Sequence, residues 1–319
     1  MIIKHPKDIT ASVLHELEGS QDERFKEIMR SAVKHLHAFV SETKLSESEY
    51  QRACAVIARL GQMTNEFHNE VVLAGGSLGV SALVCLLNNA LPKIEDEDEV
   101  RTTANMLGPF WRDESPPSQN GDNLARGETQ GDPIFVKAWV KDTNGEPVSG
   151  AMVDVWHTSA EGFYENQDPS QVDMNLRGRF KTDDKGLVEF RSVKPGGYPI
   201  PVNGPVGDLL RMQGRHNMRP AHIHFLIHKE GFKTQFSQVY SADDPNVHSD
   251  VQFGVTHSLL AHYVRREGNA PDPSIQGTWY ALEHTFTIDR GIANLPRAPI
   301  KGKNQGPLPE QVVLKANHQ

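Results

Sequence analysis

The chain has 319 residues, a length that suits two domains and allows a sizeable buried core. Its hydrophobic fraction of 37% and charged fraction of 23% are those of a globular protein, not a disordered one. The formal net charge of -8 argues against nucleic acid as the main partner, because binding to phosphates requires a basic surface. The first residues, MIIKHPKDIT, contain no apolar core of a secretory signal, so a cytoplasmic protein is expected.

Residues 1 to about 105 have the patterning of helices. The stretch 8–17 predicts a first helix, with Thr10 as a candidate capping residue. The segment 23–40 predicts a longer helix, because its apolar side chains recur at spacings of three and four along one face.

A third helix is expected to begin at Ser46, because Ser46 and Glu49 form a capping-box pattern. The segment 71–92 carries no formal charge and approaches the length of a membrane span. Its glycines, serines and asparagines favour a helix buried against another helix, so no membrane span is expected. The acidic run 94–101 is expected to be a solvated connection.

From residue 106 the sequence changes to short strands separated by turns. The segments 134–142 and 151–157 predict two strands joined by a turn at Asn144-Gly145. Later segments predict more strands and one short inserted helix: strands within 178–193, 222–241 and 284–289, and a helix at 204–214. Short strands without long helices between them indicate a β-sandwich. The expected fold class is α+β, with an N-terminal helical dimerisation domain (1–105) followed by a mainly antiparallel β-sandwich catalytic domain (106–319).

Two histidines, His222 and His224, lie two positions apart in the segment RPAHIHF. Alternate residues of a strand point to the same side, so the two imidazoles converge on one point and form half of a metal site. The chain has only two cysteines and no His-Glu-x-x-His motif, which leaves a zinc site unsupported. A cupin-type site fits poorly, because the next glutamate, Glu230, falls on an apparent turn.

Two of the six tyrosines lie in loops of unusual composition. Tyr164 follows a predicted strand in AEGFYENQDP, and Tyr198 lies in KPGGYPIP, where prolines restrict the backbone. Taken singly, each tyrosine also fits a half-buried structural side chain. A tyrosinate is a hard anionic donor, so two tyrosines with two imidazoles suit a ferric ion better than zinc or copper(I).

Four segments, in this order, resemble the intradiol ring-cleavage dioxygenases: GFYENQDP, GGYPIP, GRHNMRPAHIHF and TQFSQVYSADDP. These are non-haem iron(III) enzymes that open catechols with O2 between the two hydroxylated carbons. The resemblance covers nearly the whole chain. It implies one Fe(3+) per subunit, held by Tyr164, Tyr198, His222 and His224, with Tyr198 leaving when the substrate binds.

The same resemblance implies roles for two further residues. Arg219 matches the active-site arginine of the family, which would stabilise negative charge on the substrate ring, although a surface salt bridge is the alternative. Gln238 matches a glutamine that supports the ligands, with Gln235 as the alternative register. The family is also implied to form homodimers through the helical domain, with a phospholipid bound there in several relatives.

The segments GGYPIPVNGPVGDLL and LGPFW resemble the hydroxyquinol branch of the family, which converts 1,2,4-trihydroxybenzene to 3-hydroxy-cis,cis-muconate (maleylacetate). That branch tends to carry an acidic residue near Gly76, where this chain has Gly75 and Gly76 and therefore more room. The expected pocket wall is mostly apolar: Leu73, Gly76, Met106, Pro109, Phe110 and Phe253. Hydroxyquinol is the leading substrate, and catechol or substituted and chlorinated catechols, giving cis,cis-muconates, are the alternative.

Two interpretations from other classes stay open. A non-catalytic β-sandwich binding protein would use the histidine pair only structurally and would contain almost no iron when grown with iron. An extradiol-type iron(II) enzyme would use two histidines and a carboxylate, which gives Tyr164 and Tyr198 no role.

Overall fold

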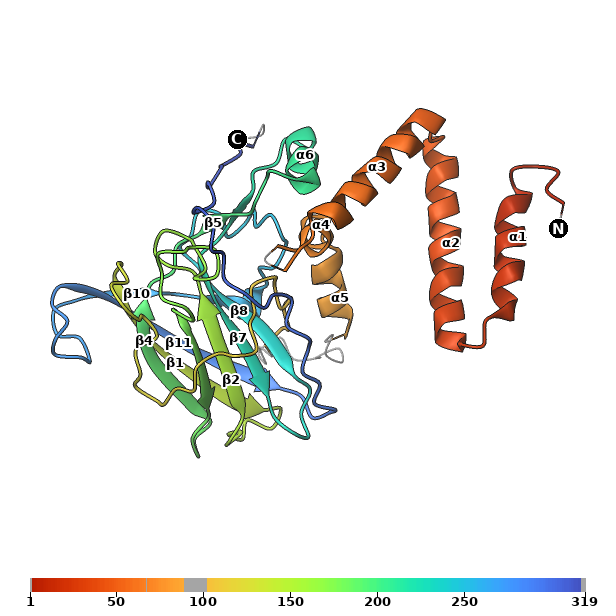
Figure 1. Ribbon diagram of the computed structural model, residues 1–319. Helices are drawn as coiled ribbons and strands as arrows, with labels where there is room; N and C mark the ends of the chain where they lie inside the picture. The colour runs from red at the N-terminus through yellow and green to blue at the C-terminus, as the bar shows by residue number, and fades with distance from the viewer. Residues whose placement is uncertain (1, 67, 89–101, 317–319) are drawn as a thin grey trace. The chain divides into compact units, whose positions relative to one another are not determined.

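The computed structural model describes residues 2–66, 68–88 and 102–316 (Figure 1). A helical N-terminal region is followed by a sheet-rich region, which confirms the expected α+β class. The chain forms two compact units, residues 1–58 and 59–319. The acidic run 94–101, expected to be a solvated connection, lies outside the described residues.

The N-terminal unit contains α1 (Asp8–Glu16), the 3-10 turn η1 (Leu17–Gly19), α2 (Glu23–Thr43) and the first part of α3 (Glu47–Met63). The predicted capping box is present at α3. The Ser46 N–H donates to the Glu49 carboxylate at 2.9 Å, and the Glu49 N–H donates to Ser46 Oγ at 3.4 Å. The prediction for Thr10 is wrong, because α1 begins at Asp8 and Thr10 Oγ1 lies 2.8 Å from Nδ1 of His37, which ties α1 to α2.

The uncharged segment predicted as one helix forms two, α4 (Glu70–Ser77) and α5 (Val80–Asn88), bent by 76°. Asn69 caps α4 by accepting a hydrogen bond from the Val72 N–H at 2.9 Å. Gly79, between the helices, has a φ of +74°, which glycine adopts without strain. Among the described residues, no single helix is long and apolar enough to cross a bilayer, and α4 and α5 reach that length only together across the bend.

Two sheets pack face to face (Figure 1). The four-stranded sheet has the order β10 (Val264–Glu267), β11 (Thr278–Ile288), β1 (Pro133–Asp142), β4 (Leu187–Val193). The five-stranded sheet has the order β3 (Arg177–Lys181), β2 (Met152–His157), β7 (His222–His228), β8 (Gln235–Ser241), β9 (Leu260–Ala261). A short ladder pairs β5 (Tyr198–Pro199) with β6 (Met218–Arg219), and the remaining elements are α6 (Pro205–Met212) and the 3-10 turn η2 (His257–Leu259). Most pairs are antiparallel, but β1–β11 and β8–β9 are parallel.

The predicted strands form, but successive strands do not all pair with each other. Gly145 adopts the turn conformation with a φ of +81°, yet β1 before it joins the four-stranded sheet and β2 after it joins the five-stranded sheet. Strands β3 and β4 are divided between the sheets in the same way, whereas β7 and β8 form an antiparallel hairpin. A turn signal specifies a change of direction and leaves the partner of the next strand open.

The core between the sheets consists of apolar side chains at alternate strand positions. On β1 and β7 they are Ile134, Val136, Ala138, Val140, Ile223, Phe225 and Ile227. Because strand residues alternate, His222 and His224 lie on the other side of β7, away from this core. A second apolar cluster covers that side, with Leu73 of α4, Leu210 of α6 and Leu226 of β7 among its members.

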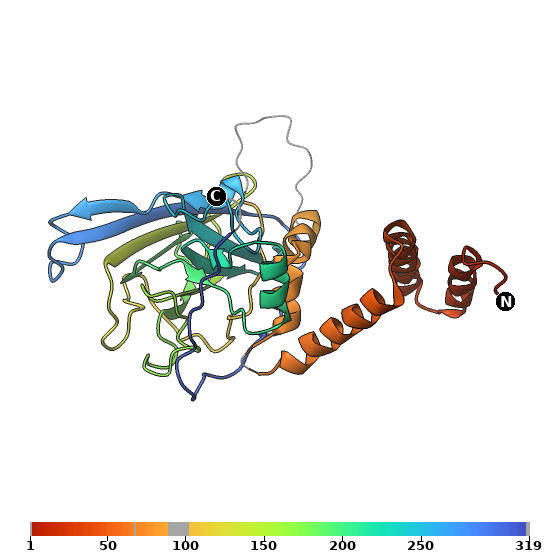
Figure 2. The same ribbon diagram turned by 90° about the horizontal axis from the view of Figure 1, so that it is seen from above.

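Helix α4 belongs to the same compact unit as the sheets. Buried Glu70 accepts a hydrogen bond from the Val206 N–H of α6 at 3.0 Å, and α6 lies beside α4 (Figures 1 and 2). The two compact units meet at residue 58, and the boundary expected near residue 105 stays a prediction. The change in periodicity marks where helices give way to strands, but packing decides where the units separate.

Candidate metal centre and substrate pocket

Four side-chain donors meet on the outer face of the five-stranded sheet. Oη of Tyr164 lies 2.8 Å from Nε2 of His224 and 3.4 Å from Nε2 of His222. Oη of Tyr198 lies 3.4 Å from that of Tyr164, and the two histidine Nε2 atoms are 3.2 Å apart. Metal–ligand bonds of about 2 Å at roughly tetrahedral or octahedral angles separate neighbouring donors by about 3 Å. The spacing of all four buried donors therefore fits a single metal ion.

Three different elements deliver these donors. The histidines occupy alternate positions of β7, Tyr164 lies in the loop after β2, and Tyr198 begins the short strand β5. Strand β5 pairs Tyr198 with Arg219 of β6, the residue three positions before His222. The structure thus brings together the four residues that the sequence resemblance singled out as ligands.

Both imidazoles are held in the neutral form. Burial, reinforced by the nearby Arg219 charge, lowers the pKa of His222 to about 3, and burial also lowers the pKa of His224 well below its usual value. Nδ1 of His222 lies 2.7 Å from the carbonyl oxygen of Pro220. A carbonyl only accepts, so Nδ1 carries the proton and Nε2 presents its lone pair to the centre. His224 stacks on Trp156, with ring centroids 4.6 Å apart, which holds its orientation.

The two tyrosines give the site its anionic character. Burial, followed by the proximity of Tyr198, raises the pKa of Tyr164 well above its usual range. A cation among the four donors would reverse this shift, because its charge stabilises a phenolate. Among the described residues, no group of three or more His, Cys, Asp and Glu side chains could hold a metal, so this candidate site depends on its tyrosines. Two phenolates and two imidazole lone pairs suit a ferric ion.

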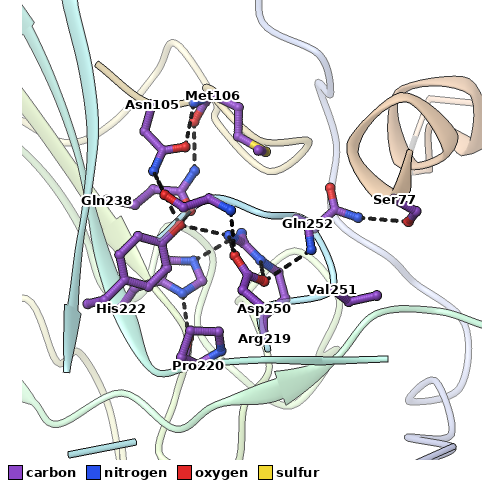
Figure 3. A network of polar contacts seen from close by, with 12 residues as sticks. Ser77, Asn105, Met106, Arg219, Pro220, His222, Gln238, Asp250, Val251 and Gln252 are labelled. Atoms are coloured by element: carbon purple, nitrogen blue, oxygen red, sulfur yellow. Dashed lines mark hydrogen bonds and ion pairs between the residues drawn. The ribbon is translucent and has the colours of Figure 1, made fainter. Parts of the chain in front are cut away.

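Arg219 is buried beside the donors and is held in place by its neighbours (Figure 3). Its Nε and Nη2 each donate to the Asp250 carboxylate at 3.0 Å, and Nη2 also donates to Oη of Tyr240 at 2.8 Å. Its Nη1 lies 3.5 Å from Nε2 of His222. Burial alone would lower the pKa of Arg219, but the Asp250 charge raises it well above its usual value. The guanidinium is therefore permanently charged and buried, and its ion pair is not at the surface.

Gln238 lies directly beside the ligands. It is opposite His224 in the β7–β8 register, whereas Gln235 is opposite Ile227 on the core side of the sheet. Nε2 of Gln238 donates to the Met106 carbonyl at 2.7 Å, and its Oε1 accepts from Tyr240 Oη at 2.8 Å. The register therefore places Gln238, and not Gln235, at the site.

A pocket extends from Tyr198 and Arg219. Four of the six residues expected in its wall line it: Leu73, Met106, Pro109 and Phe110. Apart from Arg219 and Tyr198, its polar side chains come from Gln252 and from the segment before α4.

Gly76 and Phe253 do not line this pocket, contrary to expectation. A Cβ built on Gly76 would overlap the side-chain amide of Gln252, which covers that glycine. Phe253 has a φ of +56° and turns outward, where it is 53% exposed. Its ring centroid lies 4.7 Å from the guanidinium carbon of Arg215, and both residues line a separate surface hollow.

Sequence reasoning missed three residues around the site, Tyr240, Asp250 and Gln252. Tyr240 could have been found, because it lies two positions after Gln238 and so shares its side of β8. Asp250 and Gln252 lie in an irregular segment after β8, where no periodicity assigns a direction to a side chain.

A buried ion pair anchors the loop that carries Tyr164. Nε of Arg177 donates to the Glu165 carboxylate at 2.5 Å, and both side chains are 1% exposed. Nη1 of Arg177 donates to the Phe110 carbonyl at 2.8 Å, and Nη2 donates to Oδ1 of Asn166 at 3.2 Å. One guanidinium thus connects the tyrosine loop to the wall of the pocket.

Comparison with known proteins gives two family matches and several close relatives. Residues 106–286 match the family described as Dioxygenase, and residues 22–95 match the family described as Catechol dioxygenase N terminus. A hydroxyquinol 1,2-dioxygenase of Rhizobium sp. is 38% identical over 283 residues, covering 88% of this chain and 94% of that protein. A catechol 1,2-dioxygenase of Candida albicans is 35% identical over 281 residues, covering 88% of this chain and 91% of that protein.

Solved structures agree with these matches. The crystal structure of a hydroxyquinol 1,2-dioxygenase from Pseudomonas putida DLL-E4 has a TM-score of 0.80 and 35% sequence identity, and the match covers 90% of this chain and 99% of that chain. The same motifs that carry the candidate ligands lie within the matched residues 106–286. The chain belongs to the intradiol ring-cleavage dioxygenase family.

Proposed function

We propose that this enzyme works in the cytoplasm and cleaves hydroxyquinol with O2 between its adjacent hydroxylated carbons, giving 3-hydroxy-cis,cis-muconate. The observation that carries this proposal is the convergence of two phenol oxygens and two imidazole nitrogens, 2.8–3.4 Å apart, at the end of a pocket lined by Arg219. Relatives named as hydroxyquinol 1,2-dioxygenases, at 32–38% identity, support the substrate. Catechol or a substituted catechol is the second candidate, supported by the Candida albicans relative.

The proposed cofactor is one iron(III) per subunit, held by Tyr164, Tyr198, His222 and His224. When bound, the ferric ion would chelate the two vicinal oxygens of the substrate and make the ring reactive toward O2. Oη of Tyr198 would take up one of the two protons that the vicinal hydroxyls lose on binding. The neutral His222 holds its Nε2 lone pair toward the centre, because its Nδ1 proton goes to the Pro220 carbonyl.

Arg219 supplies the positive charge at the reacting end of the pocket. It lines the pocket together with Tyr198, and its ion pair with Asp250 prevents the side chain from turning away. Such a preorganised charge stabilises negative charge that develops on the substrate ring. Losing one group of this kind costs about 3 kcal/mol of barrier, on the order of a hundredfold in rate.

The test is an anaerobic visible titration of the purified protein with hydroxyquinol and catechol in parallel, followed by turnover in air. We expect a coloured resting protein whose absorption shifts with both ligands, and tighter saturation by hydroxyquinol. Tighter saturation and faster turnover with catechol would favour the second candidate. A colourless protein that contains iron would contradict the two-tyrosine site.

We also propose a homodimer formed through the helical region 1–105, with a phospholipid bound there. Support comes from apolar side chains that are at least half exposed on α2 and α3 in the single chain: Phe25, Ile28, Leu36, Phe39, Tyr50 and Ile57. Light scattering of the purified enzyme measures its mass, and a monomer would contradict the dimer. Mass spectrometry of an organic extract tests for the lipid.

A further inference from the structure

The side chain of Gln252 occupies the space that a side chain at position 76 would need. A Cβ built on Gly76 would overlap Oε1 of Gln252 and lie 2.6 Å from its Cδ. Gly76 is buried within α4, and Gln252 belongs to the irregular segment after β8. The glutamine amide therefore reaches its place only because α4 has no side chain at this position.

The hydrogen bonds of the Gln252 amide identify its oxygen and its nitrogen. Its Nε2 lies 3.1 Å from Oγ of Ser77 and 3.5 Å from the carbonyl oxygen of Leu73, and Figure 3 shows the nitrogen directed toward Ser77. Because the Leu73 carbonyl can only accept, the atom beside it and Ser77 is the NH2 nitrogen, and Oε1 is the atom that lies over Gly76. Oε1 accepts no hydrogen bond from any residue in the described part of the chain.

Gln252 lines the substrate pocket together with Arg219 and is held at a fixed place relative to it. The Gln252 N–H donates to Oδ1 of Asp250 at 3.2 Å, and the same carboxylate holds the Arg219 guanidinium. One carboxylate thus holds both the Arg219 guanidinium and the backbone of Gln252.

The remaining polar side chains of the pocket already have partners. Oδ1 of Asn69 accepts the capping hydrogen bond of α4, and Nε2 of His68 lies 2.6 Å from the buried carboxylate of Glu70. Oε1 of Gln252 is therefore the pocket's side-chain oxygen, away from the reacting end, that accepts no hydrogen bond from the described part of the chain.

We propose that Gln252, made possible by Gly76, determines substrate specificity by accepting a hydrogen bond from a third ring hydroxyl. The inference rests on the proposed function and deepens it, because it favours a 1,2,4-triol over a 1,2-diol. A buried acceptor that stays unpaired is unfavourable, so a ring without the third hydroxyl binds less well to this wall. A methyl or chloro substituent of similar size cannot donate and leaves the acceptor unpaired.

The test compares kcat/KM for hydroxyquinol and for 4-methylcatechol, which places a methyl group where the triol has a hydroxyl. The enzyme is the full-length, iron-loaded chain. Gln252→Met keeps the size of the side chain and removes the acceptor. We expect the ratio of kcat/KM for hydroxyquinol over 4-methylcatechol to fall about tenfold, the effect of one lost hydrogen bond. The matched control is Gln213→Met, the same change at an exposed residue outside this pocket, which leaves the ratio at the wild-type value.

A second variant tests the same contact from the helix. Gly76→Ala adds a methyl group that displaces the Gln252 amide, so the ratio falls in the same direction. Adding Gly76→Ala to Gln252→Met then lowers the ratio little further, because the two changes remove the same interaction. If Gln252→Met fails to load iron, Gly76→Ala decides the question alone.

A ratio within twofold of the wild type in these variants overturns the assignment of Gln252 and leaves the proposed function intact. Failure of the proposed function is seen in the wild type alone, as absence of ring cleavage with either compound. A wild-type enzyme that cleaves 4-methylcatechol better than hydroxyquinol overturns both the substrate proposal and the role of Gln252.

Discussion

Replacing Asp250 by alanine isolates the ion pair that holds Arg219. The carboxylate accepts two hydrogen bonds from the guanidinium at 3.0 Å each, and the two side chains are 3% and 2% exposed. It also accepts from the backbone N–H groups of Gln252 and Gly254, at 3.2 Å and 2.9 Å. Asp250→Ala leaves a buried positive charge uncompensated. We expect the free energy of unfolding to fall by about 3–5 kcal/mol, the usual effect of breaking a buried pair.

Urea unfolding followed by tryptophan fluorescence measures this change. All four tryptophans belong to the unit of residues 59–319, so the signal reports the unit that contains the ion pair. Asp208→Ala is the matched control, because Asp208 pairs with Arg59 at 3.2 Å while about half exposed, and its loss costs at most about 1 kcal/mol. Replacing both Arg219 and Asp250 by apolar residues removes the unpaired charge and regains much of the stability. An Asp250→Ala variant as stable as Asp208→Ala would refute the reasoning.

Three further predictions concern the ligands and the buried histidine. Tyr164→Phe is expected to lose most of its iron or its visible absorption, and a coloured, fully active variant would contradict that ligand. Burial lowers the pKa of His157 to about 4, so the unfolded chain binds a proton more readily than the folded chain between about pH 6.5 and pH 4. The free energy of unfolding therefore falls by about 3 kcal/mol as the pH drops through this range. Urea midpoints at pH 7 and pH 5 should differ more in the wild type than in His157→Gln. Arg177→Lys keeps the charge but loses the hydrogen bonds by which one guanidinium joins Glu165, Asn166 and the Phe110 carbonyl. A chelator should therefore remove iron about tenfold faster from this variant. The same change at half-buried Arg191 is the control and leaves the rate unchanged.

The sequence predictions that the structure confirms depend on residues close together in the chain. His222 and His224 share a face because the two-residue period belongs to any strand, whatever its partners. The capping box at Ser46 and Glu49 likewise depends on residues three positions apart. The four candidate ligands were found because their surrounding motifs resemble a family, and the structure places their donor atoms around one point.

Predictions that depend on distant partners were less successful. Strand β1 pairs in parallel with β11, which comes from the other end of the domain sequence. No turn signal near β1 indicates this pairing. Gly76 suggested extra space in the pocket, but the structure fills that space with Gln252 from a remote segment. The meaning of a small residue in a core depends on the side chain that packs against it, which the local sequence does not contain.

The four candidate ligands differ in how firmly the backbone holds them. The two histidines lie on β7, which is paired on both sides, by β2 and β8. The loop of Tyr164 is fixed by the buried guanidinium of Arg177. Tyr198 lies on a strand of two residues, and Pro199 beside it has no N–H to donate to a ladder. A ligand that must leave when the substrate binds should be the one with the fewest restraints. Backbone restraint therefore favours Tyr198 as the displaceable ligand, on grounds independent of the family resemblance.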